Sequence, residues 1–110
     1  MHLLVLMDCD GFVWTGTAFK WPSSDTPPMT FAPEDALRTA FALAVSHKAL
    51  LSDGNIEIHQ YEPSTESSYR FLSTDNARIW PKAEFAFRQH TGVQLERETY
   101  LQWRDCPALM

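Results

Sequence analysis

The segment Asp8-Cys9-Asp10-Gly11 holds the side chains of this chain that are best suited to chemistry. It follows an apolar run that extends from Leu3 to Met7. Two carboxylates one residue apart at the end of an apolar strand can hold Mg²⁺, or can supply a nucleophile and an acid. A hairpin turn explains the same residues more simply, because Asp and Gly tolerate tight-turn conformations. Asp8 and Asp10 are therefore alternative catalytic and metal-binding candidates beside this structural interpretation.

The longer stretch of residues 4–14, with these aspartates at its centre, resembles the first motif of haloacid-dehalogenase-type phosphatases. The resemblance implies that Asp8 accepts the phosphoryl group and that Asp10 is the general acid or base. The stretch Phe71-Leu72-Ser73-Thr74 is similar to the second motif of that family, an apolar strand that ends in Ser or Thr. The family also requires a later lysine and a distal acidic pair, and Lys82 is the only lysine after this stretch. A small Mg²⁺-dependent phosphatase-like domain is therefore an alternative function.

Other signatures of catalysis are missing from the sequence. No serine lies in a GxSxG turn, and the four glycines form no phosphate-binding loop. The histidines do not fall at metal-site spacings and are interpreted as isolated surface or half-buried residues: His2, His47, His59 and His90. Cys9 and Cys106 have no CxxC partner and are expected to be free thiols. The sequence therefore favours a protein that is not an enzyme and that carries no cofactor.

Length and composition indicate one folded domain over residues 1–110. Apolar residues make up 45% of the chain and charged residues 21%, which is typical of globular proteins and excludes a disordered chain or a disulfide scaffold. No apolar run approaches the ~20 residues that are needed to cross a bilayer. No basic segment precedes the first apolar run, so a signal peptide is not expected either. The sequence therefore predicts a cytoplasmic protein.

The formal net charge of the chain is −5, and it is unevenly distributed. Residues 1–68 contain nine acidic and three basic side chains, whereas residues 69–110 contain five acidic and six basic ones. An acidic chain is poorly suited to nucleic acid, because phosphate contacts need Lys and Arg. The acidic N-terminal part is instead suited to a protein partner with a basic surface, since complementary charge steers association.

The first part of the chain predicts a hairpin followed by a stiff loop. Strands over residues 2–8 and 12–20 flank Asp10-Gly11, and Asp-Gly between two apolar runs is a strong hairpin signal. The first strand is apolar on both faces, so we expect it to be central in a sheet. Residues 22–33 contain four prolines, which restrict the conformations of this loop.

A helix over residues 34–51 follows the loop. Pro33 suits its first turn, because the missing N–H of proline costs nothing there. Leu37, Phe41 and Val45 recur at helical spacing and are expected to pack against one face of the sheet.

The second part of the chain predicts another hairpin and another helix. Apolar and polar side chains alternate over residues 55–62, which indicates a strand, and an apolar run over residues 69–74 indicates a second one. Trp80-Pro81 begins a helix, and Gly92 ends it as a C-terminal cap.

Residues 93–103 alternate between apolar and polar side chains, which favours a last strand. A helix over residues 96–104 is the alternative, because these residues are good helix formers. The expected order is β-β-α-β-β-α-β. It predicts an α+β domain with an antiparallel sheet of four to five strands and two helices on one face.

The start of the chain is also similar to the HicB-type antitoxin domain. The similarity lies in the hairpin with Asp-x-Asp-Gly, the proline-containing loop, and the segment Thr30-Phe31-Ala32-Pro33-Glu34-Asp35-Ala36-Leu37 that opens an Ala-rich helix. It covers about half of the chain. It implies a ββα start and a protein that neutralises a small ribonuclease toxin by covering its active face. The Gly-Cys pair of that family and its C-terminal DNA-binding element have no counterpart in this sequence.

Trp21 beside the proline-rich loop is the best candidate for an exposed anchor, because Trp is enriched among interface hot spots. With Asp25 and Asp10 it forms the predicted partner-binding site. We expect a small acidic protein that binds and inhibits or neutralises a basic protein partner, of the antitoxin, immunity or phage anti-defence type. The alternatives are the phosphatase-like domain and a self-associating structural domain, a homodimer that pairs a sheet edge through residues 93–103.

Overall fold

The computed structural model describes residues 3–8, 10–23, 25, 27–46, 55–62 and 67–106. Its elements are, in chain order, β1 (Leu3–Met7), β2 (Val13–Trp14), β3 (Phe19–Lys20), α1 (Pro33–Ser46), β4 (Glu57–Glu62), β5 (Ser67–Ser73), α2 (Thr74–Ala77), α3 (Trp80–Thr91) and α4 (Arg97–Asp105). The strands form one antiparallel sheet in the order β3-β2-β1-β4-β5. The predicted α+β class is therefore confirmed.

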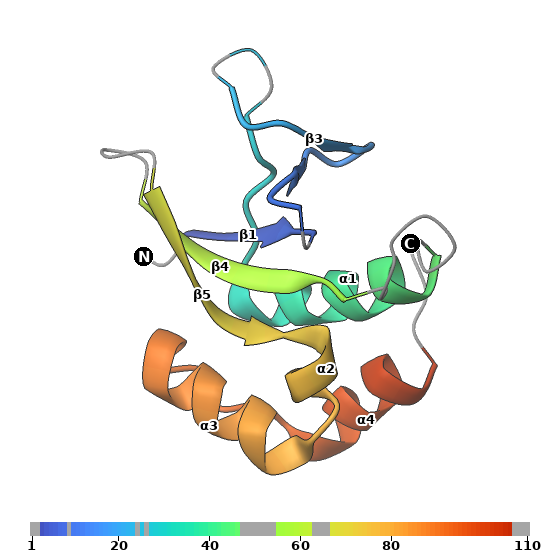
Figure 1. The fold of residues 1–110 in the computed structure, drawn as a ribbon. Coiled ribbons are helices and arrows are strands. Elements are labelled where there is room, and N and C mark those ends of the chain that lie inside the picture. The colour runs from blue at the N-terminus through green and yellow to red at the C-terminus, as the bar shows by residue number, and fades with distance from the viewer. Residues whose placement is uncertain are drawn as a thin grey trace.

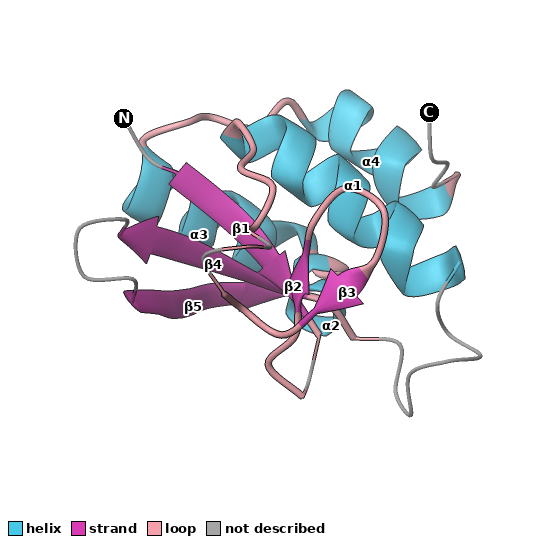
Figure 2. Ribbon diagram, turned by 90° about the horizontal axis from the view of Figure 1, so that it is seen from above, coloured by secondary structure: helices cyan, strands magenta, loops and turns pink. Residues whose placement is uncertain are grey.

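The helices of the described residues lie on one face of the sheet, as the sequence predicts, although there are four of them instead of two (Figure 1). Residues 12–30, which we call the arm, contain β2, β3 and the proline-rich segment. The arm rises from the opposite face of the sheet, and the view from above shows it in front of the helices (Figure 2). None of the helices in the described ranges is long and apolar enough to cross a membrane.

Strand β1 is central and is buried on both faces, as its apolar sequence predicts. It pairs with β4 from Leu3↔Tyr61 to Met7↔Glu57 and with β2 through Met7↔Val13. Leu4 and Leu6 belong to the core cluster that also contains α1, and both are fully buried. Val5 is 1% exposed, although alternation along the strand turns it to the other face.

The predicted strand over residues 12–20 is two short strands instead of one. The N–H of Thr15 donates to the carbonyl of Ala18 at 3.0 Å, which closes a turn between β2 and β3. Gly16 takes φ 104° in this turn, a conformation that side chains with a Cβ rarely adopt. The glycine therefore divides a stretch that the sequence predicts as one strand.

Helix α1 begins at Pro33, as predicted, and packs on the sheet through Leu37 and Phe41, both fully buried. The sequence predicts that Val45 shares this face, but its side chain is 53% exposed. With 3.6 residues per turn, Val45 lies about 40° beyond Phe41 around the helix axis. The buried stripe continues instead through Ala40 and Ala44. Residues 47–51 of the predicted helix lie outside the described residues.

Helix α3 confirms the predicted start at Trp80-Pro81 and the cap at Gly92, which has φ 73°. The predicted strand over residues 93–103 is wrong, because α4 occupies most of this region, close to the alternative helix over residues 96–104. A strand would have placed Tyr100 on the polar face. Tyr100 is fully buried, and its ring centroid lies 6.1 Å from that of Phe41 and 5.0 Å from that of Trp80. The predicted self-association, in which a strand over residues 93–103 pairs with a sheet edge of a second copy, is therefore also wrong.

Candidate functional site

Asp8 lies directly after β1 and organises the turn into β2. Its side chain is buried, and Oδ1 accepts hydrogen bonds from the backbone N–H groups of Asp10 at 3.0 Å and Phe12 at 2.9 Å. Gly11 takes φ 89° within the turn. This is the geometry that the hairpin-turn interpretation of the sequence requires.

Asp8 and Asp10 do not share one environment, because Asp10 is exposed while Asp8 is buried. Both sheet neighbours of β1 run antiparallel to it, unlike the parallel sheet of the phosphatase family. Thr74, at the end of the second motif, has a structural role: its Oγ1 donates to Asn55 Oδ1 and accepts from the N–H of Ile56, both at 2.9 Å. In the described part of the chain, which omits Cys9, no three His, Cys, Asp or Glu side chains are grouped to hold a metal ion. This geometry supports a turn rather than phosphoryl transfer.

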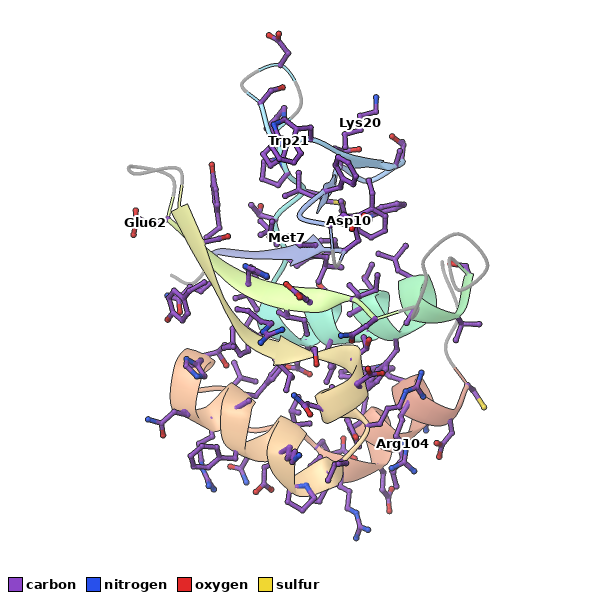
Figure 3. The ribbon with its side chains drawn as sticks, in the orientation of Figure 1. Met7, Asp10, Lys20, Trp21, Glu62 and Arg104 are labelled. Atoms are coloured by element: carbon purple, nitrogen blue, oxygen red, sulfur yellow. The ribbon has the colours of Figure 1, made fainter. Side chains whose placement is uncertain are left out.

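The three predicted partner-binding residues all lie on the face of the sheet that the helices leave open. Trp21 and Asp10 lie on the arm side of the sheet (Figure 3), and Asp25 belongs to the arm itself. Trp21 is 67% exposed, and its ring leans edge-on against Phe12 with 5.7 Å between centroids. Asp10 and Asp25 are also exposed.

Backbone hydrogen bonds attach the proline-rich segment to β1 and β2. The N–H of Phe31 donates to the carbonyl of Leu4, and the N–H of Met29 donates to the carbonyl of Trp14, both at 2.9 Å. The ring of Trp14 also packs against Phe19, with 5.2 Å between centroids. These contacts hold the proline-rich segment above β1.

A pocket of about 220 Å³ lies between the arm and the sheet. The arm contributes Val13 and Pro22 among others, and the sheet contributes Val5, Tyr61 and Ser68. The walls are mainly apolar, with a few hydroxyl groups. Pockets for drug-sized molecules measure about 300–1,000 Å³. This one is therefore suited to a single side chain or a short aliphatic group.

A chain of polar side chains adjoins this pocket on β4 and β5. His59 Nε2 lies 2.8 Å from Glu57 Oε1, and His59 Nδ1 lies 3.1 Å from Ser68 Oγ. Arg70 donates to the second carboxylate oxygen, Glu57 Oε2, at 3.3 Å. The side chains of His59 and Glu57 are 12% and 21% exposed, so these two polar groups are partly shielded from water. The sequence indicates that His59 is an isolated histidine, and it therefore does not predict the contacts of His59 with Glu57 and Ser68.

The pairing of β4 with β5 explains how these residues meet. Alternation along β4 turns Glu57 and His59 to the same face of the sheet. A register shift between Ile58 and His59 moves the pairing of β5, so that His59 lies opposite Arg70 and Tyr61 lies opposite Ser68. The sequence shows that Glu57 and His59 alternate with apolar residues and so share a face of the strand. Which residues of β5 lie beside them depends on the register between β4 and β5.

The chain matches no family model, no curated protein and no solved structure. The similarity to HicB-type antitoxins therefore stays a prediction. Any functional interpretation depends on the geometry described above.

The groups with shifted pKa values lie on the other side of the sheet, in α4 (Figure 3). Burial raises the pKa of Tyr100, whose hydroxyl donates to the carbonyl of Ala77. The hydrogen bond between Arg104 and Asp105, at 2.8 Å, raises the pKa of Arg104 and lowers that of Asp105. These three groups belong to the helical packing and do not reach the pocket. Cys106 follows them as an exposed free thiol, as predicted, whereas Cys9 lies outside the described residues.

Proposed function

We propose that this protein binds a basic protein partner through its arm and thereby inhibits or neutralises that partner. The exposure of Trp21, at 67% on a segment that stands away from the helices, is the observation that carries the proposal. Trp21 has the largest exposed fraction among the large apolar side chains of the described residues, and Trp is one of the residue types enriched in interface hot spots. The exposed carboxylates of Asp10 and Asp25 flank the same face.

The distribution of charge supports a basic partner on this side. Residues 74–110, which include α2, α3 and α4, contain five acidic and five basic side chains. The described residues of the sheet, of the turn after β1 and of the arm contain five acidic side chains and only two basic ones, Lys20 and Arg70. An acidic surface accelerates encounter with a basic protein and disfavours nucleic acid. This agrees with an antitoxin, immunity or anti-defence role in the cytoplasm.

The rigidity of the arm also supports binding. Four prolines restrict residues 22–33, and backbone hydrogen bonds attach Met29 and Phe31 to β2 and β1. Residues whose backbone conformation is already restricted lose little conformational entropy when a partner binds. The arm is therefore suited to recognition without refolding.

The proposal is tested by affinity capture with the full chain as bait, at low and at high ionic strength. We expect one basic protein to be retained by the parent chain and lost by Trp21→Ala and by Asp25→Lys. Matched controls are Phe85→Ala, which removes another exposed ring from α3, and Glu98→Lys, which makes the same charge change on α4. Both controls are expected to retain the protein. High salt is expected to reduce capture, because exposed charges are screened beyond about 10 Å at 0.1 M salt.

Two outcomes would contradict the proposal. Capture that is equal for the parent, the arm variants and the controls would show that the arm is only a connector. Retention of a second copy of this chain, through surfaces insensitive to Trp21→Ala, would favour the self-associating alternative instead.

A further inference from the structure

The hydrogen bonds of Glu57 determine the proton positions in the polar chain beside the pocket. Its two carboxylate oxygens contact two different donors, His59 Nε2 at 2.8 Å and Arg70 at 3.3 Å. A carboxylate that accepts at both oxygens has no proton to give, so Nε2 of His59 carries the hydrogen. In a neutral imidazole the other nitrogen, Nδ1, then has a free lone pair.

Ser68 is consequently the donor in its contact with His59. Its Oγ lies 3.1 Å from Nδ1 of His59 and, among the described residues, 3.8 Å from a second acceptor, Met7 Sδ. A thioether is a weak acceptor, so the imidazole is the preferred one. The order carboxylate, imidazole and serine hydroxyl is that of an activated serine nucleophile, with a base that a third group orients.

We propose that Ser68 is a nucleophile that accepts a short acyl group from an ester, with His59 as its general base and Glu57 as a positioning residue. Ser68 lines the pocket, so an acyl group held there meets its hydroxyl. Tyr61, the cross-strand neighbour of Ser68, lines the same pocket and brings a hydroxyl donor of the kind that an oxyanion needs. The proposal uses neither Trp21 nor Asp25, and it is therefore independent of partner binding by the arm.

The size of the pocket limits the acyl group. A volume of about 220 Å³ with apolar walls from Val5, Val13 and Pro22 suits a chain of a few carbons. One further methylene in an apolar pocket changes specificity about 10-fold or more. We therefore expect a butyryl ester to be preferred over an acetyl ester, and a long fatty-acyl ester to be excluded.

The reaction is an acyl transfer followed by hydrolysis. The Oγ of Ser68 forms a bond to the acyl carbon while its proton passes to Nδ1 of His59. The bond between the acyl carbon and the alcohol oxygen breaks, and His59 returns the proton to that oxygen. Water then attacks the acyl serine, its proton passes to His59, and Ser68 leaves with that proton as the hydroxyl.

The test uses the full chain with p-nitrophenyl butyrate and p-nitrophenyl acetate. We expect intact-mass measurement to detect one acyl adduct, which peptide mapping assigns to Ser68. Ser68→Ala is expected to abolish the adduct and to reduce turnover to that of buffer. His59→Gln is expected to reduce turnover about 100-fold or more, because positioned bases contribute 10²–10⁴-fold. Ser46→Ala, which removes an exposed hydroxyl at the end of α1, is the control and is expected to behave as the parent.

Glu57→Gln tests the positioning role separately from the fold. Its amide can donate to Nε2, which would move the imidazole hydrogen to Nδ1 and remove the base from Ser68. We expect turnover to fall while the thermal midpoint stays close to that of the parent. The ¹⁵N shifts of the His59 ring are expected to report hydrogen on Nε2 in the parent and on Nδ1 in this variant.

Absence of an adduct on Ser68 in the folded parent chain would overturn the proposal. Equal turnover by the parent, Ser68→Ala and His59→Gln would do so as well, because the polar chain would then only join β4 to β5. Partner capture and ester hydrolysis are measured in separate experiments. Failure of one proposal therefore does not imply failure of the other.

Discussion

The arm and the helical layer of this protein are held together in different ways. The helical layer, which consists of α1 to α4, contains fully buried rings such as Phe41, Phe87 and Tyr100. The arm, in contrast, exposes 67% of Trp21 and 44% of Met29, and of its described side chains only those of Val13 and Trp14 are buried. Buried apolar area supplies most of the free energy of folding. The helical layer therefore stabilises the molecule, while the arm is available for recognition.

The pocket lies at the boundary between these two regions. Its floor is the sheet, which the helical layer stabilises, and its roof is the arm. Ser68 lies on the floor, and Glu57 and His59 lie beside it on β4, so the geometry of the three residues depends on strand pairing. A site built on strands is held more precisely than one built on loops. Changes in the arm are therefore expected to alter access to the pocket more than the geometry of these three residues.

Phe41→Ala is expected to have the largest effect on stability, because it removes a fully buried ring from the helical layer. We expect a loss of about 3–5 kcal/mol in the free energy of unfolding, measured by chemical denaturation. The exposed ring of Phe85 on α3 provides the matched control, and Phe85→Ala is expected to change stability by no more than about 0.5 kcal/mol. A loss below about 1 kcal/mol for Phe41→Ala would break the comparison, since the ring would then contribute little to the core.

Substitutions at Asp8 are expected to have an intermediate effect, because this residue organises the turn that joins β1 to the arm. Asp8→Ala removes the acceptor of the N–H groups of Asp10 and Phe12, and we expect a loss of about 1–3 kcal/mol. Asp8→Asn keeps an acceptor oxygen, and we expect a loss of about 1 kcal/mol or less. The same denaturation assay measures both. Equal losses for the two variants would mean that the turn does not depend on these hydrogen bonds.

Trp21→Ala is expected to have the smallest effect on stability. The side chain is mostly exposed, so we expect a change within about 0.5 kcal/mol, although partner capture is lost. Denaturation of the variant beside the parent measures the first quantity. A loss above about 2 kcal/mol would contradict the comparison, because Trp21 would then contribute to the core as Trp14 does.

Local sequence signals predicted the elements that have clear beginnings and ends. Pro33 marked the start of α1, and Gly92 marked the end of α3. Residues 93–103 were misassigned because alternation and helical spacing both fit this short stretch. The deciding fact is the burial of Tyr100 against Phe41, a contact between residues distant in sequence that no local pattern contains.

The candidate site was harder to predict than the fold. The sequence drew attention to Asp8 and Asp10, where turn chemistry and catalytic chemistry use the same residue types. It passed over His59 and Ser68, which lie nine residues apart on different strands. Their contact depends on the register shift after Ile58, and register is a property of the assembled sheet.

The arm leaves and rejoins the sheet along the same strand, β1, so the scaffold is suited to exchange of the arm for another segment. Val13 pairs with Met7, and Phe31 bridges to Leu4, so both ends of the arm lie along one side of the same central strand. Three residues of a strand span about 10 Å, a distance that a short connection can close. A graft of a different arm would have to cover Val5 and Met7 and to supply the buried side chains of Val13 and Trp14. The scaffold can therefore keep its sequence while its recognition surface diversifies, as antibody domains do with their loops.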